Sequence, residues 1–181
     1  MHICDYTGRQ PEIEPLLPEM FIIISQNMRE ITPSGNTMEE DRKSWTQAMR
    51  EELRNPEKHW ILLFSGEALA GYTLYRIENH PGPSDHPSKE GNYLHMDEIQ
   101  IAKHFQGDGR AFPMLMGKLL EDARAAGAAT LFSYANRQNI KSHGILGAMG
   151  LQVYEETPRG LRYRGRAEDA LAWFKTKYHI E

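Results

Sequence analysis

The residues with the clearest chemical potential lie in a short loop between a strand-like segment and a helix-like segment. The loop reads Gln-Gly-Asp-Gly-Arg-Ala over residues 106–111. Its glycines allow backbone angles that other residues avoid, so the amides of residues 108–111 can converge beside the positive end of the following helix. Such a cradle suits phosphate oxygens. The predicted phosphate-binding residues are Gln106, Gly107, Asp108, Gly109, Arg110 and Ala111.

Two common phosphate-binding motifs do not match this loop. It has two glycines where a dinucleotide fingerprint has three, and the Gly-Lys-Ser/Thr triplet of a P-loop does not follow. A strand, loop and helix of this kind can also be a plain turn without a ligand. The choice therefore depends on the rest of the chain.

Ionisable side chains occupy the strand-like segment ahead of the loop. In an extended chain His95 and Asp97 share one face, and Glu98 lies on the other. An imidazole and a carboxylate on one face can form a base and an outlet for its proton. A histidine and an aspartate that merely share a wet strand end would give the same pattern. Glu98 is the alternative base if the strand is bulged or its register differs.

The elements that would position these residues follow from hydrophobic periodicity and from turn residues. Helices are expected over residues 16–31, 37–54, 112–126, 139–149 and 167–177. Strands are expected over residues 59–64, 69–77, 93–102, 130–135, 151–155 and 161–166. Strands followed by helices predict a mixed α/β (α+β) sheet domain, and we expect it to span residues 1–181 as a single unit.

Composition and charge argue against several classes of protein. The net charge is −4, which disfavours a nucleic-acid partner, and we interpret the arginines of residues 159–166 as a solvated strand or turn. One cysteine excludes an internal disulfide, and the histidines show no spacing typical of metal ligands. No secretory signal is visible, and no apolar run could span a bilayer. We expect a cytoplasmic protein with no metal and no membrane partner.

The loop resembles the pyrophosphate loop of the GNAT N-acetyltransferase superfamily. That loop reads Gln or Arg, two variable residues, Gly, one variable residue, and then Gly or Ala, which fits Gln106, Gly109 and Ala111. Asn139 and Gly150 resemble the family's later helix, and the order of expected elements is the family order. The likeness covers residues 16–166 and implies a mostly antiparallel sheet with splayed central strands and flanking helices.

The resemblance also implies a co-substrate and a site. Acetyl-CoA would lay its pyrophosphate on the loop, and the acceptor would be a primary amine of a small molecule or a peptide. Family bases commonly stand eleven and nine residues before the loop's first residue, at His95 and Asp97. The pantetheine arm would pair with the strand near Ile99, Gln100 and Ile101. Further cofactor contacts are implied at Asn136, Asn139 and Ser142.

One departure from the family keeps other functions open. The family's frequent general acid, a tyrosine, stands four residues before the glycine that ends the later helix, and here that position is Leu146. Tyr134, Tyr154 or a water could replace it, or the thiolate could leave unaided. The alternatives are a non-catalytic acyl-CoA-binding or regulatory protein of the same fold, and an unrelated domain that binds a phosphate-containing ligand.

The C-terminal helix raises the question of assembly. Residues 167, 170, 171, 174 and 178 form an apolar face at helical spacing. A lone helix of this length is marginal in water, so the face must pack against its own sheet or against a second subunit. Because two-fold homodimers are the commonest oligomers, we expect a homodimer.

Overall fold

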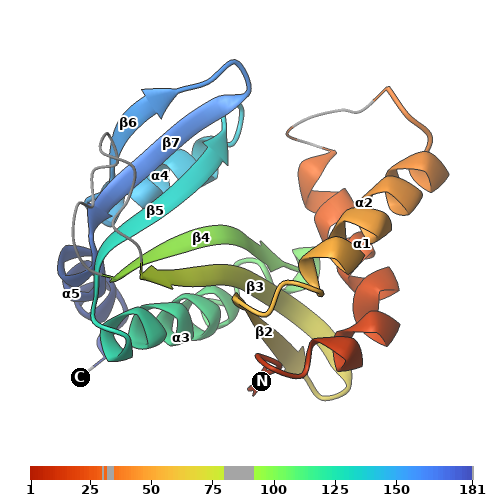
Figure 1. Cartoon of the computed structure of the whole chain (residues 1–181), viewed down its shortest axis with the longest axis horizontal. Coiled ribbons are helices and arrows are strands. Elements are labelled where there is room, and N and C mark those ends of the chain that lie inside the picture. The colour runs from red at the N-terminus through yellow and green to blue at the C-terminus, as the bar shows by residue number, and fades with distance from the viewer. Residues whose placement is uncertain (30, 32–34, 80–91, 181) are drawn as a thin grey trace. The chain divides into compact units, whose positions relative to one another are not determined.

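Figure 1 shows a computed structural model of the chain, which describes residues 1–29, 31, 35–79 and 92–180. Its seven-stranded sheet has the order β1-β2-β3-β4-β5-β7-β6. The strands are β1 (His2–Asp5), β2 (Lys58–Ser65), β3 (Ala68–Asn79), β4 (Asn92–Ile101), β5 (Ala128–Asn136), β6 (Gln152–Glu156) and β7 (Gly160–Arg166). The β4–β5 pair is parallel, whereas β1–β2, β5–β7 and β6–β7 are antiparallel. This mixed, mostly antiparallel sheet with helices confirms the predicted fold class.

The helices differ from the sequence prediction mainly near the N-terminus. They are η1 (Gln10–Leu16), α1 (Leu17–Met28), α2 (Met38–Glu52), η2 (Lys103–Phe105), α3 (Ala111–Ala125), α4 (Ile140–Ala148) and α5 (Ala167–Tyr178). Strand β1 and the 3₁₀ helix η1 were not predicted. Four residues are too few for a periodic pattern, and the two prolines of η1 lack the amides that a regular α-helix needs.

The start of α2 shows that the local sequence signal for a helix N-terminus was sufficient to predict where this helix begins. Thr37 and Glu40 form the predicted capping box: the Thr37 hydroxyl accepts from the Glu40 amide, and the Glu40 carboxylate accepts from the Thr37 amide at 2.8 Å. The sequence places Met38 and Met49 on one apolar stripe of this helix. Met49 is buried, but Met38, in the first turn, is 46% exposed, so the prediction is wrong for Met38.

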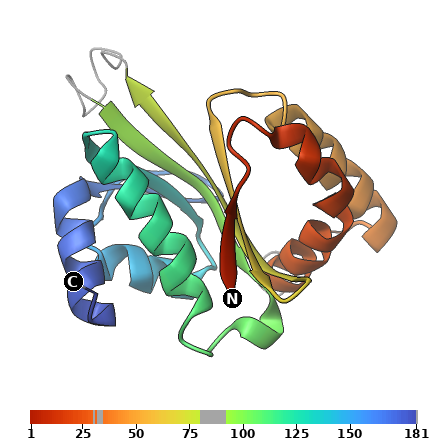
Figure 2. The ribbon, with the colours of Figure 1, turned by 90° about the horizontal axis from the view of Figure 1, so that it is seen from below.

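The chain forms two compact units, each built from two stretches of sequence. The first comprises Met1–Leu74 and Glu98–Leu115, and its core contains Met20 and Trp60. Figure 2 shows α1 and α2 side by side on one face of the sheet formed by β2 and β3. The apolar stripe predicted for α1 thus contributes to the core. That the whole chain is one domain stays a prediction.

The second unit comprises Tyr75–Asp97 and Met116–Glu181, and in it α5 packs against β5 and β7. Ala170 and Phe174 of the predicted apolar face of α5 are buried. A Cβ at Gly117 of α3 would lie 3.2 Å from the Phe174 ring, so a glycine leaves room for it. The helix covers its own sheet. The homodimer stays a prediction, but the apolar face of this helix no longer supports it.

Gly71 of β3 permits a close approach of backbone to backbone. A Cβ at this position would lie 2.5 Å from the Gln100 carbonyl oxygen of β4. We expect Gly71→Ala to lower the free energy of unfolding by about 1–3 kcal/mol, because overpacking forces the strands apart. Gly144→Ala is the control: a Cβ there meets nothing within 4 Å, and alanine should stabilise α4 by about 0.5–1 kcal/mol. Urea denaturation measures both, and equal effects would contradict the prediction.

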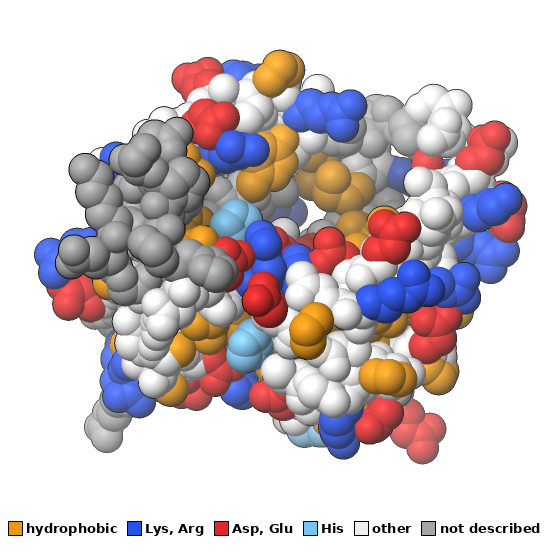
Figure 3. Space-filling view, in the orientation of Figure 1, with side chains coloured by type: hydrophobic (Ala, Val, Ile, Leu, Met, Phe, Trp, Pro, Cys, Tyr) orange, Lys and Arg blue, Asp and Glu red, His pale blue; other side chains and the backbone are white. Residues whose placement is uncertain are grey.

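The arginines near the C-terminus are balanced by acidic side chains. Arg162 pairs with Glu155 at 2.7 Å, and Arg166 pairs with Glu168. Charges of both signs are interspersed among the coloured residues on the face shown in Figure 3. This arrangement fits a solvated strand. Among the described residues, no helix is both long enough and apolar enough to cross a bilayer.

Candidate functional site

The loop between β4 and α3 has the backbone geometry that its glycines suggested. Gly107 and Gly109 have φ angles of 99° and 75°, in the left-handed region that favours glycine. A Cβ at either position would meet nothing within 4 Å, so both glycines border open space. The glycines are therefore needed here for the backbone conformation, and they leave the loop accessible.

The Asp108 side chain accepts hydrogen bonds from backbone amides at the start of α3. Its Oδ1 accepts hydrogen bonds from the backbone N–H of Arg110 at 2.9 Å and of Ala111 at 3.3 Å. These bonds, that from Arg110 above all, lower the pKa of the Asp108 carboxyl from its ordinary value. Two loop amides do converge on one point, and a carboxylate oxygen satisfies them. An incoming phosphate would have to take the place of this carboxylate.

A network of side-chain amides holds the first residue of the loop. Gln106 Nε2 donates to Asn27 Oδ1 at 2.8 Å and to the Ile101 carbonyl at 2.9 Å. Asn27 Nδ2 donates to Gln100 Oε1 at 2.8 Å and to the same Ile101 carbonyl at 3.1 Å. The network joins the end of α1, the end of β4 and the loop.

The end of β4 presents a limited set of backbone groups to a ligand. The Glu98 carbonyl accepts from the Thr73 hydroxyl of β3 at 2.9 Å, and the Gln100 carbonyl lies against β3 at Gly71. Since successive carbonyls alternate along a strand, those of Ile99 and Ile101 point away from β3. Two side chains already bond the Ile101 carbonyl. The backbone of Ile99 is therefore the better candidate for pairing with a pantetheine arm.

The pairing of β4 with β5 ends before β4 does. The two strands pair in parallel as far as Met96 and Ser133, whereas β4 continues to Ile101. An early end to the pairing fits a sheet with splayed central strands, as the fold class requires.

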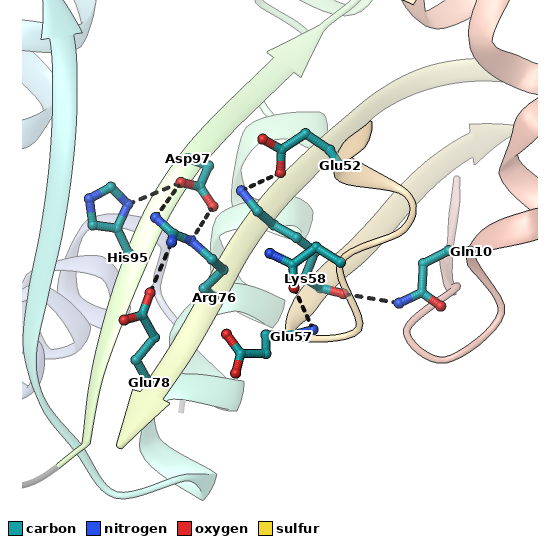
Figure 4. A network of polar contacts seen from close by, with 9 residues as sticks. Gln10, Glu52, Glu57, Lys58, Arg76, Glu78, His95 and Asp97 are labelled. Carbon is teal, nitrogen blue, oxygen red and sulfur yellow. Dashed lines mark hydrogen bonds and ion pairs between the residues drawn. The ribbon is translucent and has the colours of Figure 1, made fainter. Parts of the chain in front are cut away.

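His95 and Asp97 come together as predicted, within a larger network of the second unit. His95 Nδ1 lies 3.1 Å from Asp97 Oδ1, and Arg76 of β3 approaches Asp97 at 3.2 Å. Arg76 also pairs with Glu78 at 3.0 Å, and Glu78 accepts a hydrogen bond from the Tyr93 hydroxyl at 2.6 Å. Figure 4 shows His95 and Arg76 directed at the Asp97 carboxylate.

This network assigns different chemistry to its two predicted bases. The Asp97 carboxylate accepts hydrogen bonds from the Arg76 guanidinium through both of its oxygens, so it is held as an acceptor in a fixed position. With Nδ1 facing that carboxylate, a neutral His95 ring carries its proton on Nδ1 and offers the Nε2 lone pair. The ring also stacks on Phe132 of β5, with centroids 6.4 Å apart. That His95 or Asp97 is the base stays a prediction; in this arrangement Asp97 would orient the ring and His95 would accept the proton.

Glu98 lies on the other face of β4 and binds a buried tyrosine of its own unit. The Tyr72 hydroxyl donates to Glu98 Oε1 at 2.7 Å. Burial, with the nearby Glu98 charge and the hydrogen bond to it, raises the pKa of Tyr72 well above its ordinary value. The Glu98 carboxylate therefore already has a hydrogen-bond partner, and Glu98 stays the alternative base.

Replacing Tyr72 should reveal this bond in the stability of the protein. We expect Tyr72→Phe to lower the free energy of unfolding at neutral pH by about 1–3 kcal/mol, because Glu98 loses a donor. Since the raised pKa favours the neutral phenol in the folded state, wild-type stability should fall as the pH rises above 10.0, the ordinary value. Tyr72→Phe should make that fall less steep.

Urea denaturation at neutral pH and above pH 10 measures both effects. Tyr134→Phe is the control, because the Tyr134 side chain is 42% exposed and should change neither quantity. An unchanged alkaline slope in Tyr72→Phe would contradict the assignment.

The later helix contributes caps and a buried leucine. Asn139 Oδ1 accepts from the Ser142 amide at 3.1 Å and so caps α4, and Asn136 Oδ1 accepts from the Gln138 amide at 3.0 Å. Within the described part of the chain, the side-chain N–H groups of these two asparagines have no hydrogen-bond partner. Leu146 is 6% exposed and belongs to the core, so it supplies no proton.

The two tyrosines considered as replacements for the general acid lie against other groups. A Cβ at Gly160 would come 2.5 Å from the Tyr134 hydroxyl, so this phenol lies across β7. Tyr154 lies edge-on to Phe132 and beneath Arg164. Burial raises the pKa of Tyr154. Neither contact marks its tyrosine as the proton donor.

Sequence reasoning missed five residues of these networks: Asn27, Tyr72, Arg76, Glu78 and Tyr93. Arg76 and Glu78 alternate on β3 as His95 and Asp97 alternate on β4, and that shared period was a usable signal. Asn27 and Tyr72 lie inside apolar segments, and only the fold shows their partners.

Some predicted features lie outside the described residues. The histidines His80 and His86 belong to this group, as do most of the loop after β3 and part of the turn between α1 and α2. In the described part of the chain, no three His, Cys, Asp or Glu side chains are grouped so as to hold a metal ion.

Comparisons with known proteins found a matching family and similar solved structures. A sequence model of the Acetyltransferase (GNAT) family matches residues 24–150. The fold is similar to that of the PaiA N-acetyltransferase from Thermoplasma acidophilum in complex with coenzyme A, with 13% identity, a TM-score of 0.68 and coverage of 92% of this chain and 99% of that one. It is also similar to an acetyltransferase from Thermus thermophilus, with 21% identity, a TM-score of 0.56 and coverage of 86% and 92%. No curated protein matches the sequence.

Proposed function

The chain belongs to the Acetyltransferase (GNAT) family, and we propose that it moves an acetyl group from acetyl-CoA to a primary amine of a small molecule or a peptide. The observation that carries this proposal is the loop before α3, where two left-handed glycines stand beside backbone amides that converge on one oxygen. Converging amides at a helix N-terminus are suited to a diphosphate.

The cofactor contacts follow from the same loop and from β4. The diphosphate would bind the amides of residues 108–111 after the Asp108 carboxylate has moved aside. The pantetheine arm would pair with the backbone of Ile99, because the Ile101 carbonyl is occupied by side-chain amides. Asn136 and Asn139 are proposed as further cofactor contacts.

The proposed chemistry is direct transfer with a general base. An amine that arrives as ammonium must first lose a proton, and His95 Nε2 accepts it while Asp97 holds the ring. The amine nitrogen then attacks the thioester carbonyl, the carbon–sulfur bond breaks, and coenzyme A leaves as a thiolate. The nitrogen of the new amide gives up its second proton to water. Because Leu146 carries no acidic hydrogen, the thiolate takes its proton from water.

An acceptor screen tests this function. Purified protein is incubated with acetyl-CoA and a panel of amines, and free thiol is measured with and without each amine. Release that depends on one class of amine, together with the acetylated product by mass spectrometry, supports the proposal. Binding of acetyl-CoA in calorimetry without release of thiol for any amine favours the second candidate, a non-catalytic acyl-CoA-binding protein. The buried Leu146 at the usual position of the general acid supports this second candidate. Absence of binding contradicts both.

A further inference from the structure

Asn27 is unusual among the polar residues of α1 because every hydrogen-bonding group of its side chain faces the cofactor loop or the strand before it. Its Nδ2 donates to Gln100 Oε1 and to the Ile101 carbonyl, and its Oδ1 accepts from Gln106. These two donors and one acceptor reach three different residues. The four bonds of the network, including the Gln106 bond to Ile101, have lengths between 2.8 and 3.1 Å.

The network fixes a residue that would otherwise be mobile. Gln106 is exposed, and a glycine in the left-handed conformation follows it directly. A solvated glutamine has rotamer freedom that its ordering must overcome. Two bonds from Gln106 Nε2, one to Asn27 and one to the Ile101 carbonyl, set where the chain leaves β4 and so where the amides of the loop begin.

We propose that Asn27 is a positioning residue for acyl-CoA, which acts through Gln106 on the loop between β4 and α3. This inference rests on the proposed function, because it assigns the diphosphate to that loop. Asn27 itself touches neither the diphosphate nor the reacting atoms. It orders the loop before the ligand arrives, so binding does not have to supply that ordering.

A purely structural role would look different in experiment. If Asn27 only attached α1 to the sheet, its loss would lower stability and leave the affinity of the folded protein for coenzyme A unchanged. A positioning role predicts weaker binding of coenzyme A even when every molecule is folded. It also predicts that replacing Asn27 has no further effect on binding once Gln106 has been replaced.

The test is a double-mutant cycle on coenzyme A affinity, measured by isothermal titration calorimetry. Asn27→Ala and Gln106→Ala should each raise Kd by about fivefold to tenfold, because each removes bonds of ordinary strength that order the loop. The double variant should bind within about twofold of Gln106→Ala alone, because residues in one network are not additive. Where turnover is measurable, KM for acetyl-CoA should rise while kcat is retained.

The control is Gln26→Ala, an exposed neighbour on the same helix, which should bind coenzyme A as the wild type does. Circular dichroism establishes that each variant is folded. Should Asn27→Ala not fold, Asn27→Leu keeps the side-chain volume and removes the acceptor for Gln106 together with both donors, and its Kd should also rise. Unchanged affinity in the folded Asn27 variant, or fully additive losses, would overturn the inference alone. A wild type that does not bind coenzyme A would overturn the proposed function as well.

Discussion

Gly109→Val should weaken the binding of coenzyme A by roughly 10- to 150-fold, because each lost hydrogen bond to a charged group costs about 1.5–3 kcal/mol. The reason is local. The backbone at Gly109 has a φ of 75°, which a β-branched residue scarcely adopts, so valine would turn the neighbouring amides away from their common point. The valine side chain would also enter the open space that the phosphates are proposed to fill. Calorimetry with coenzyme A measures the change.

The matched control is Gly66→Val in the turn between β2 and β3. Gly66 has a φ of 63°, and a Cβ there also meets nothing within 4 Å, so the backbone strain is comparable. Both variants should lose similar stability, and only Gly109→Val should lose affinity. If the two variants bind coenzyme A equally well, the loop is not the phosphate site.

The second large effect is expected at the proposed base. His95→Gln and Asp97→Asn should each lower kcat/KM by about 10²–10⁴-fold, the usual cost of removing an acting base or the group that orients it. His95→Gln should also change the acid limb of the pH profile, where a protonated base loses activity. Steady-state kinetics over a range of pH, with the acceptor found in the screen, measures both quantities.

Asp97 needs a control because it has a second partner. Glu78→Gln removes the other carboxylate that pairs with Arg76 and leaves the contact between His95 and Asp97 in place. We expect its rate to stay within a few-fold of the wild type. Equal losses in Asp97→Asn and Glu78→Gln would mean that Arg76, not His95, carries the effect. Wild-type rates and pH profiles in both His95→Gln and Asp97→Asn would exclude both as bases, and Glu98 would be tested next.

Features that depend on neighbours in sequence could be predicted before the structure. The capping box of Thr37 and Glu40, the turn at Gly66 and the left-handed loop glycines all follow from a few adjacent residues. The contact between His95 and Asp97 is of the same kind, because strand alternation alone places two such residues on one face.

Features that depend on residues far apart in the chain could not be predicted. Asn27 and Gln106 are separated by 79 positions, and Tyr72 and Glu98 by 26. Nothing in an apolar helix or strand indicates which distant polar group an asparagine or a tyrosine within it will meet. The role of α5 was open for the same reason: its apolar face was visible in the sequence, but the surface that covers it was not.

The carboxylate of Asp108 has a consequence for the pace of a catalytic cycle. In the ligand-free protein it saturates the Arg110 and Ala111 amides. Under the proposed function, entry of acyl-CoA would be an exchange of one anion for another, and its departure would be the reverse exchange. We expect the departing coenzyme A to leave no bare donors behind, because an internal anion would take its place, and we expect this to shorten the residence time of the product. Where product release limits turnover, replacement of the product by the Asp108 carboxylate would weaken product binding and raise the turnover rate.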